Sequence, residues 1–246
     1  MDALSVAGLL LALTAVIVGQ YLDGGQLSML INGPALLIVG GGTLGATMVQ
    51  SPLDVFLRAL RMLAWVFRPP TLQIEAVMQD LLQWCRLARR DGLLGLENIV
   101  NGVKYDYARK ALQLLIDGND PIVIRETLQI DSATREARDL QAARVFEGMG
   151  GYAPTLGILG AVIGLIHVMN NLSDPSLLGH GIGIAFVATV YGVGFANVFL
   201  LPAANKLKTL VRNETRLQEM ITIGIVALAD GENPRIVEAR LQGLLG

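Results

Sequence analysis

Four long stretches of the chain consist almost entirely of hydrophobic and small residues, and ionisable side chains are nearly absent from them. Residues 1–50 contain only two carboxylates and residues 149–205 contain only one. All 19 lysines and arginines lie within residues 58–144 or residues 206–240. About 20 predominantly apolar residues cross a hydrocarbon core of roughly 30 Å. The pattern therefore predicts a multi-span membrane protein.

Four spans are expected, at residues 4–21, 27–49, 152–169 and 182–201. The turns within the two helix pairs, around Asp23 and around Asp174, lack positive charge, whereas basic residues follow the second and the fourth span. The positive-inside rule therefore places both turns outside and both termini in the cytoplasm. A cleaved signal peptide over residues 1–22 is disfavoured, because its first residues would carry Asp2 and no basic side chain.

The basic stretches are predicted to be helical. Apolar residues recur with a 3.6-residue period over residues 53–67, 72–90 and 107–116, and a polar helix runs from Ser132 toward Gly148. The expected fold class is an all-α polytopic membrane protein with four transmembrane helices and a helical cytoplasmic domain between helices 2 and 3. The expected domains are transmembrane helices 1 and 2 (residues 1–50), the cytoplasmic helical domain (51–148), transmembrane helices 3 and 4 (149–204) and cytoplasmic C-terminal helices (205–246).

Composition argues against several functional classes. The net charge of −2 gives no indication of nucleic-acid binding. One cysteine, Cys85, and two histidines, His167 and His180, cannot form a typical metal cluster, and no phosphate-binding loop is present. We therefore expect no enzyme, metal or cofactor, and we interpret Cys85 as an inert thiol. His167 is interpreted as a hydrogen-bonding residue at the outer end of its span rather than as a proton carrier.

Small residues are spaced as in closely packed membrane helices. Gly160 and Gly164 form one GxxxG pair and Gly41 and Gly45 another, and small residues follow one face of the fourth span at Ala185, Thr189, Gly192 and Ala196. Small residues let helix backbones approach closely in lipid, where the hydrophobic effect does not drive helix association. The spacing predicts tight helix packing and leaves open whether it lies within one chain or between chains.

No span carries an aspartate or glutamate in its middle. A group that binds and releases a cation at depth is normally an intramembrane carboxylate. If this chain moves ions, the carboxylate must come from another subunit, and this chain would supply polar walls through Thr155, Thr189 and Asn197. The alternative is that these side chains bond to carbonyl groups of their own helices.

Two sequence segments and the overall layout resemble the MotA family of flagellar stator subunits. The segments are residues 150–167 (GGYAPTLGILGAVIGLIH) and residues 185–192 (AFVATVYG), and the layout is two spans, a long cytoplasmic stretch and two further spans. The similarity extends over essentially the whole chain, and within the family it is greatest to the MotC branch.

This resemblance implies a function, partners and a location. MotA-like subunits form a homopentamer around two MotB-like (here MotD-type), single-span, peptidoglycan-anchored subunits, each of which carries the ion-binding aspartate. Ion flow through the bacterial inner membrane then drives torque on the rotor protein FliG. The translocated ion is expected to be H+, because Ala188 beside Thr189 removes one hydroxyl, and Na+ stays open. Besides these proteins, the expected partner is membrane lipid.

The resemblance also implies roles for seven residues of this chain. Thr155 and Thr189 match positions on the ion path, Pro154 and Pro202 match prolines that affect torque, and the rotor contact matches Arg89, Arg90 and Glu97. From the residues alone, both prolines are also explained as markers of helix ends, and both arginines as a solvated helix face.

Two other functions were compared with this one. A TolQ- or ExbB-like energiser of envelope transport uses the same helix core, but such proteins typically have three spans and an external N-terminus. A secondary transporter commonly has an internal repeat, and no repeat relates residues 1–50 to residues 150–204.

Overall fold

The computed structural model describes residues 2–170 and 175–245, and every regular element in that part of the chain is a helix. Four helical stretches are long and apolar enough to cross a membrane, which confirms the predicted all-α fold with four spans. They lie in Ala3–Leu22, Leu27–Gln50, Pro121–Asn170 and Gly181–Ala229. The turn predicted at residues 170–175, between the third and fourth spans, includes residues 171–174, which lie outside the described residues.

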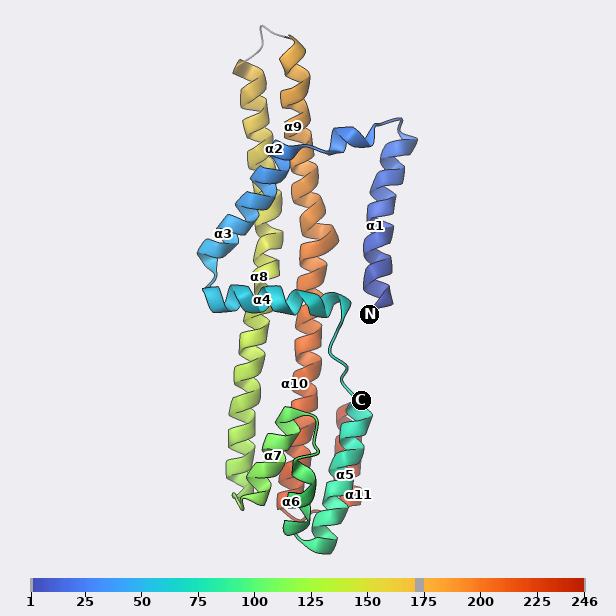
Figure 1. Cartoon of the computed structure of the whole chain (residues 1–246), viewed down its shortest axis with the longest axis vertical. Coiled ribbons are helices and arrows are strands. Elements are labelled where there is room, and N and C mark those ends of the chain that lie inside the picture. The colour runs from blue at the N-terminus through green and yellow to red at the C-terminus, as the bar shows by residue number, and fades with distance from the viewer. Residues whose placement is uncertain (1, 171–174, 246) are drawn as a thin grey trace. The chain divides into compact units, whose positions relative to one another are not determined.

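The chain forms two compact units. Unit 1 contains Met1–Pro69 and Asp139–Thr209, and unit 2 contains Pro70–Arg138 and Leu210–Gly246. Helices α8 (Pro121–Asn170) and α10 (Leu201–Ala229) contribute residues to both units (Figure 1). The residue boundaries expected for four domains stay a prediction.

The first two spans belong to unit 1 and differ in regularity. Helix α1 (Ala3–Leu22) is one uninterrupted helix, and the side chain of Asp2 accepts a hydrogen bond from the Leu4 N–H at its start. The second span is divided into a 3-10 turn and three helical segments. The first of these helical segments follows Asn32, whose side chain accepts a hydrogen bond from the Ala35 N–H. These segments are η1 (Leu27–Leu30), α2 (Gly33–Leu36), the π-helical η2 (Leu37–Gly41) and α3 (Gly42–Gln50).

The two prolines singled out in the sequence occupy different helical positions. Pro154 lies inside α8, so the interpretation that it marks a helix end is wrong. Pro202 is the second residue of α10, and it directly follows the π-helical segment η3 (Phe195–Leu200), which continues from α9 (Pro175–Gly194). A proline lacks an N–H and its ring clashes with the carbonyl four residues earlier. A π-helical turn shifts the hydrogen-bond register, so the chain stays helical through Pro202.

Glycines bring the backbones of α8 and α9 into contact. A methyl group placed on Gly192 would lie 2.5 Å from the Ala153 carbonyl oxygen, and one on Gly157 would lie 2.9 Å from the Ala188 carbonyl oxygen. Gly164 is equally close, since a methyl group there would lie 2.8 Å from the Gly181 carbonyl oxygen. The prediction of tight packing is therefore confirmed for this GxxxG segment, and the contact lies within one chain.

The second GxxxG pair has a different environment. A methyl group placed on Gly41 or Gly45 would meet no atom of the described residues within 4 Å. This pair therefore makes no close backbone contact in the single chain.

A cluster around Lys206 joins the start of α1 to two other elements of unit 1. The Lys206 ammonium group donates to the carboxylate of Asp2, to the hydroxyl of Ser5 and, at 2.8 Å, to the carbonyl oxygen of Val66. The Asp2 N–H donates to the Phe67 carbonyl oxygen at 2.8 Å. The hydrogen bond from Lys206 lowers the pKa of Asp2 below its ordinary value. No residue of α1 is buried in the chain, and this cluster ties its start to α4 and α10.

Helix α4 (Leu53–Phe67) matches the amphipathic helix expected at residues 53–67. Its buried residues recur every three or four positions, at Val55, Ala59, Met62 and Val66. Arg58 forms an ion pair with Asp139 of α8, which fixes the helix against unit 1.

Unit 2 is a helical bundle around one apolar core. Its further helices are α5 (Ile74–Asp91), α6 (Leu94–Val100), α7 (Asp106–Ile116) and α11 (Pro234–Leu245). The expected helices at 72–90 and 107–116 correspond to α5 and α7, whereas the helix expected from Ser132 begins earlier, at Pro121. Asp120 accounts for that start, because its carboxylate accepts from the Ile122 N–H at 2.8 Å.

Two side chains of the unit 2 core illustrate its packing. Cys85 is 2% exposed, and burial raises the pKa of its thiol to about 11. The Tyr107 hydroxyl lies between α8 and α10, with the Leu128 carbonyl oxygen at 2.8 Å and the Thr222 hydroxyl at 2.9 Å. The raised pKa keeps the Cys85 thiol protonated at neutral pH, as expected of an inert cysteine.

Candidate ion-path and rotor-contact sites

The two threonines expected on the ion path both bond to their own helices. Thr155 on α8 is exposed, and its hydroxyl donates to the Tyr152 carbonyl oxygen at 2.8 Å. Thr189 on α9 is half-buried, and its hydroxyl donates to the Ala185 carbonyl oxygen at 3.3 Å. A hydroxyl has one proton to donate and two lone pairs. Each oxygen therefore keeps accepting capacity for a protonated carboxylate or for a cation.

The packing of α8 against α9 brings the segments that carry these threonines together. A methyl group on Gly157, two residues after Thr155, would lie 3.4 Å from the Cα atom of Thr189. A methyl group on Gly192 would lie 3.1 Å from the Cα atom of Pro154. Pro154, Thr155 and Thr189 thus belong to one level of the helix pair, while Pro202 lies beyond η3, farther along the chain.

Asn197 follows the same hydrogen-bonding pattern in η3. It is exposed, and its side-chain amide donates to the Val193 carbonyl oxygen at 3.0 Å. All three polar side chains therefore donate to carbonyl groups of the helical stretch that carries them, which is the alternative that we considered from the sequence. These bonds use the hydroxyl protons of the two threonines and leave the oxygen lone pairs available as acceptors.

The residues expected to contact the rotor lie where α5 ends and α6 begins. Arg89 and Arg90 are exposed in the last turn of α5, and Glu97 is exposed in the first turn of α6. Gly92 separates the helices with a φ of +74°, a conformation that favours glycine. The structure therefore places all three side chains in the same helix–turn–helix segment of unit 2.

The two arginines differ in their partners. Arg90 forms a two-pronged ion pair with Asp91, at 2.9 Å and 2.8 Å, which raises the pKa of Arg90 and lowers the pKa of Asp91. Among the residues that the structure describes, neither Arg89 nor Glu97 forms an ion pair. Arg89 is therefore more available than Arg90 to a charged partner.

Comparison with known proteins shows the family of the chain. Residues 6–92 match the motility protein A N-terminal family, and residues 100–220 match the MotA/TolQ/ExbB proton channel family. Motility protein A of Bacillus subtilis (strain 168) is 35% identical over 242 residues, which cover 98% of this chain and 90% of that protein. The chain belongs to the MotA/TolQ/ExbB proton channel family.

Other members of this family match along their full length. The chemotaxis protein PomA of Vibrio alginolyticus is 29% identical, over 100% of this chain and 96% of that protein. A solved structure of C. jejuni MotAB superimposes with a TM-score of 0.95 at 32% identity, over 100% of this chain and 96% of that chain. The flagellar MotAB stator complex from Bacillus subtilis gives 0.90 at 34% identity, over 98% and 96%. The resemblance to MotA is confirmed, whereas the assignment to the MotC branch stays a prediction.

Tyr191, two residues after Thr189, has a structural role that the sequence analysis did not identify. Its hydroxyl donates to the Leu30 carbonyl oxygen and accepts from the Asn32 N–H at 3.1 Å. It thereby holds the start of the second span against α9, where Ala35 and Val39 are fully buried. A tyrosine in an apolar stretch carries no sequence signal for a contact so distant in the chain.

Tyr191→Phe is expected to lower the free energy of unfolding of the purified protein by about 1–3 kcal/mol and with it the melting temperature, because the Asn32 N–H and the Leu30 carbonyl oxygen lose their partner. Tyr152→Phe is the matched control, since its hydroxyl makes no hydrogen bond within the described residues. Equal melting temperatures for the two variants would contradict the assigned role.

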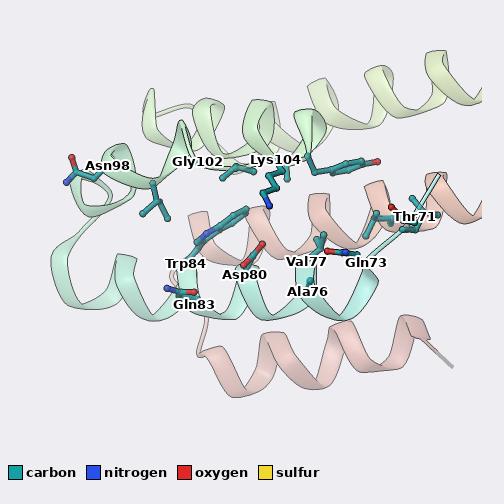
Figure 2. A pocket seen from close by; sticks show the side chains of 16 residues that line it. Thr71, Gln73, Ala76, Val77, Asp80, Gln83, Trp84, Asn98, Gly102 and Lys104 are labelled. Carbon is teal, nitrogen blue, oxygen red and sulfur yellow. The ribbon is translucent and has the colours of Figure 1, made fainter.

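A cavity of about 820 Å³ lies in unit 2, between α5 and the segment that joins α6 to α7. Figure 2 shows Trp84, Asp80 and Lys104 around it. Partial burial raises the pKa of Asp80. The cavity contains none of the residues expected to act in this channel family, and the described residues contain no cluster of three metal-ligating side chains.

Proposed function

We propose that this chain is the A subunit of a flagellar motor stator, in which ion flow is converted into torque. The observation that carries the proposal is the match to MotAB structures over 98–100% of the chain at 32–34% identity. Its relatives include proteins named motility protein A and chemotaxis protein PomA, and neither name denotes an enzyme. A bacterial inner-membrane location with both termini in the cytoplasm is part of the proposal, supported by the four spans and the basic residues that follow them.

A MotB-like subunit is proposed to supply the acid that this chain lacks. The solved relatives are MotAB complexes, and the spans of this chain carry no carboxylate at mid-depth. The exposed Thr155 and the half-buried Thr189 would accept hydrogen bonds from the protonated form of that carboxyl group through their oxygen lone pairs. The proposed assembly has five copies of this chain around two copies of the MotD-type partner, and H+ is the proposed ion.

Torque is proposed to pass from the spans to unit 2 and then to FliG. Pro154 and Pro202 lack the N–H of a regular helical residue, so each interrupts the hydrogen-bond ladder where its helix could bend. One charge crossing 100 mV releases about 2.3 kcal/mol. Exposed ion pairs contribute roughly 0–1 kcal/mol each. Contacts of Arg89 and Glu97 with the rotor could therefore form and break within one ion-driven step.

Proton flux into vesicles tests the proposed function. We expect vesicles that contain this chain together with a MotB-like subunit to take up protons when a membrane potential is applied, because the partner completes the ion path. Vesicles that contain either subunit alone serve as controls and should stay near the background rate. Equal flux through this chain alone would contradict the proposal that the acid comes from a partner.

Glu97→Lys is expected to reduce swimming speed severalfold while membrane insertion and partner binding persist, because the new ammonium group would repel the rotor groups that the exposed carboxylate attracts. Glu126→Lys reverses an exposed charge on α8 and is the matched control. A torque–speed curve equal to wild type for Glu97→Lys would remove this residue from the proposed rotor contact.

A further inference from the structure

Helix α4 has two apolar faces, and the chain covers only one of them. The face formed by Val55, Ala59, Met62 and Val66 is buried in unit 1. The opposite face is formed by Leu53, Leu57, Leu60 and Ala64, which recur at helical spacing and are all exposed. The leucines of this uncovered face are 72%, 42% and 48% exposed in chain order.

The connection to α3 places α4 at the end of a membrane span. Helix α3 ends at Gln50 and α4 begins at Leu53, so two residues separate them. Two extended residues reach about 7 Å. Ser51 and Pro52 are both extended, which prevents α4 from continuing the direction of α3. Figure 1 shows α4 running across the direction of α9.

A basic edge borders the uncovered face. Arg61 lies within α4 and Arg68 is the residue that follows its last turn; both are exposed, and seven residues of helix span about 10 Å. In contrast to Arg58, neither forms an ion pair within the described residues. Trp65 lies on the same side, half-buried, and Asp54 is the one carboxylate of α4. An amphipathic helix with tryptophan and arginine beside its apolar face is typical of a membrane–water interface.

We propose that α4 anchors unit 1 in the cytoplasmic leaflet and that Arg61 and Arg68 bind anionic phospholipid headgroups. Leu53, Leu57 and Leu60 enter the boundary between headgroups and acyl chains, since that boundary begins where α3 ends. A guanidinium group presents paired donors that match phosphate oxygens. A second copy of the chain would cover the uncovered face equally well, but it would not require two unpaired arginines at its border. The proposal goes beyond stator function and depends only on the membrane location.

Quenching of Trp65 by brominated lipids tests the proposal. The stator complex is reconstituted in phosphatidylcholine vesicles with equal mole fractions of acyl-brominated phosphatidylglycerol or acyl-brominated phosphatidylcholine. The signal of Trp65 is the difference between wild type and Trp65→Phe. We expect quenching by both lipids, with local enrichment of phosphatidylglycerol of roughly fivefold per arginine at low salt. Added salt should reduce this preference.

The variant Arg61→Gln/Arg68→Gln should keep the quenching and lose the preference for phosphatidylglycerol. Arg86→Gln/Arg125→Gln removes two exposed arginines of unit 2 and should keep the preference. An unquenched Trp65 in wild type would indicate a protein-covered face and overturn the anchor. Equal quenching by the two lipids in wild type, or a preference that survives in the double variant, would overturn headgroup binding. If the double variant fails to assemble, the wild-type comparison and its salt dependence still decide between these outcomes.

Discussion

Gly192→Ala is expected to separate α8 from α9 and to abolish assembly of a working stator. The added methyl group would lie 2.5 Å from the Ala153 carbonyl oxygen and 3.1 Å from two Cα atoms, those of Gly157 and Pro154. These are backbone atoms, so no side chain can rotate away. Overpacking costs about 1–3 kcal/mol where side chains can adjust. We expect a loss at or above the upper end of that range, because two helix backbones must move apart.

Gly194→Ala on the same helix is the matched control for this prediction. A methyl group on Gly194 would meet no atom of the described residues within 4 Å. Alanine should be neutral there or stabilise the helix by about 0.5–1 kcal/mol. The two variants are compared by melting temperature in detergent and by swimming in a strain that depends on this stator. If Gly192→Ala melted and swam like Gly194→Ala, the close backbone contact would be refuted.

Thr189→Ala is expected to reduce ion flux by roughly 10- to 100-fold while membrane insertion stays normal. The change removes the hydroxyl oxygen proposed to face the carboxylate of the partner. Its bond to Ala185 needs no replacement, because the acceptor is a carbonyl group within the same helix. Without this acceptor, the O–H of the protonated carboxyl group is left unpaired, which costs about 1–3 kcal/mol in a buried site and corresponds to this range of flux.

Two further variants separate an ion-path role from a general loss of a hydroxyl. Thr189→Ser keeps an oxygen at the same position and should restore most of the flux. Thr209→Ala removes a hydroxyl of α10 that also donates to its own helix, at 3.1 Å to the Asn205 carbonyl oxygen, and should leave flux unchanged. Normal flux in vesicles that contain Thr189→Ala would exclude this residue from the ion path.

Features that depend on local sequence were predicted correctly. Residues 53–67 were expected to form a helix and α4 has these bounds, because the 3.6-residue period of apolar positions specifies its buried face. The four spans were predicted because a length of uncharged apolar sequence is itself the property that a bilayer requires. Helix α6 was missed, since seven residues between Gly92 and Gly102 are too few to show a period.

Features that depend on contacts between distant segments were not predictable in this way. Gly160–Gly164 and Gly41–Gly45 have the same spacing, yet α9 packs closely against the first pair and no described atom lies near the second. Pro154 looked like a helix boundary and lies inside α8. The sequence alone does not distinguish Arg89 from Arg90. In the structure they differ in charge pairing, because Asp91 forms an ion pair with Arg90.

The sequence by itself determined the helical class, the four spans, the absence of an acid at their centre and the family, since each of these follows from the order of residues along one segment. The tertiary structure alone decided that the GxxxG contact lies within the chain, that Tyr191 holds the second span against α9, and that one face of α4 is uncovered. These features are decided by which backbone and side-chain atoms of remote segments come within contact distance, and that depends on the packing of the whole unit.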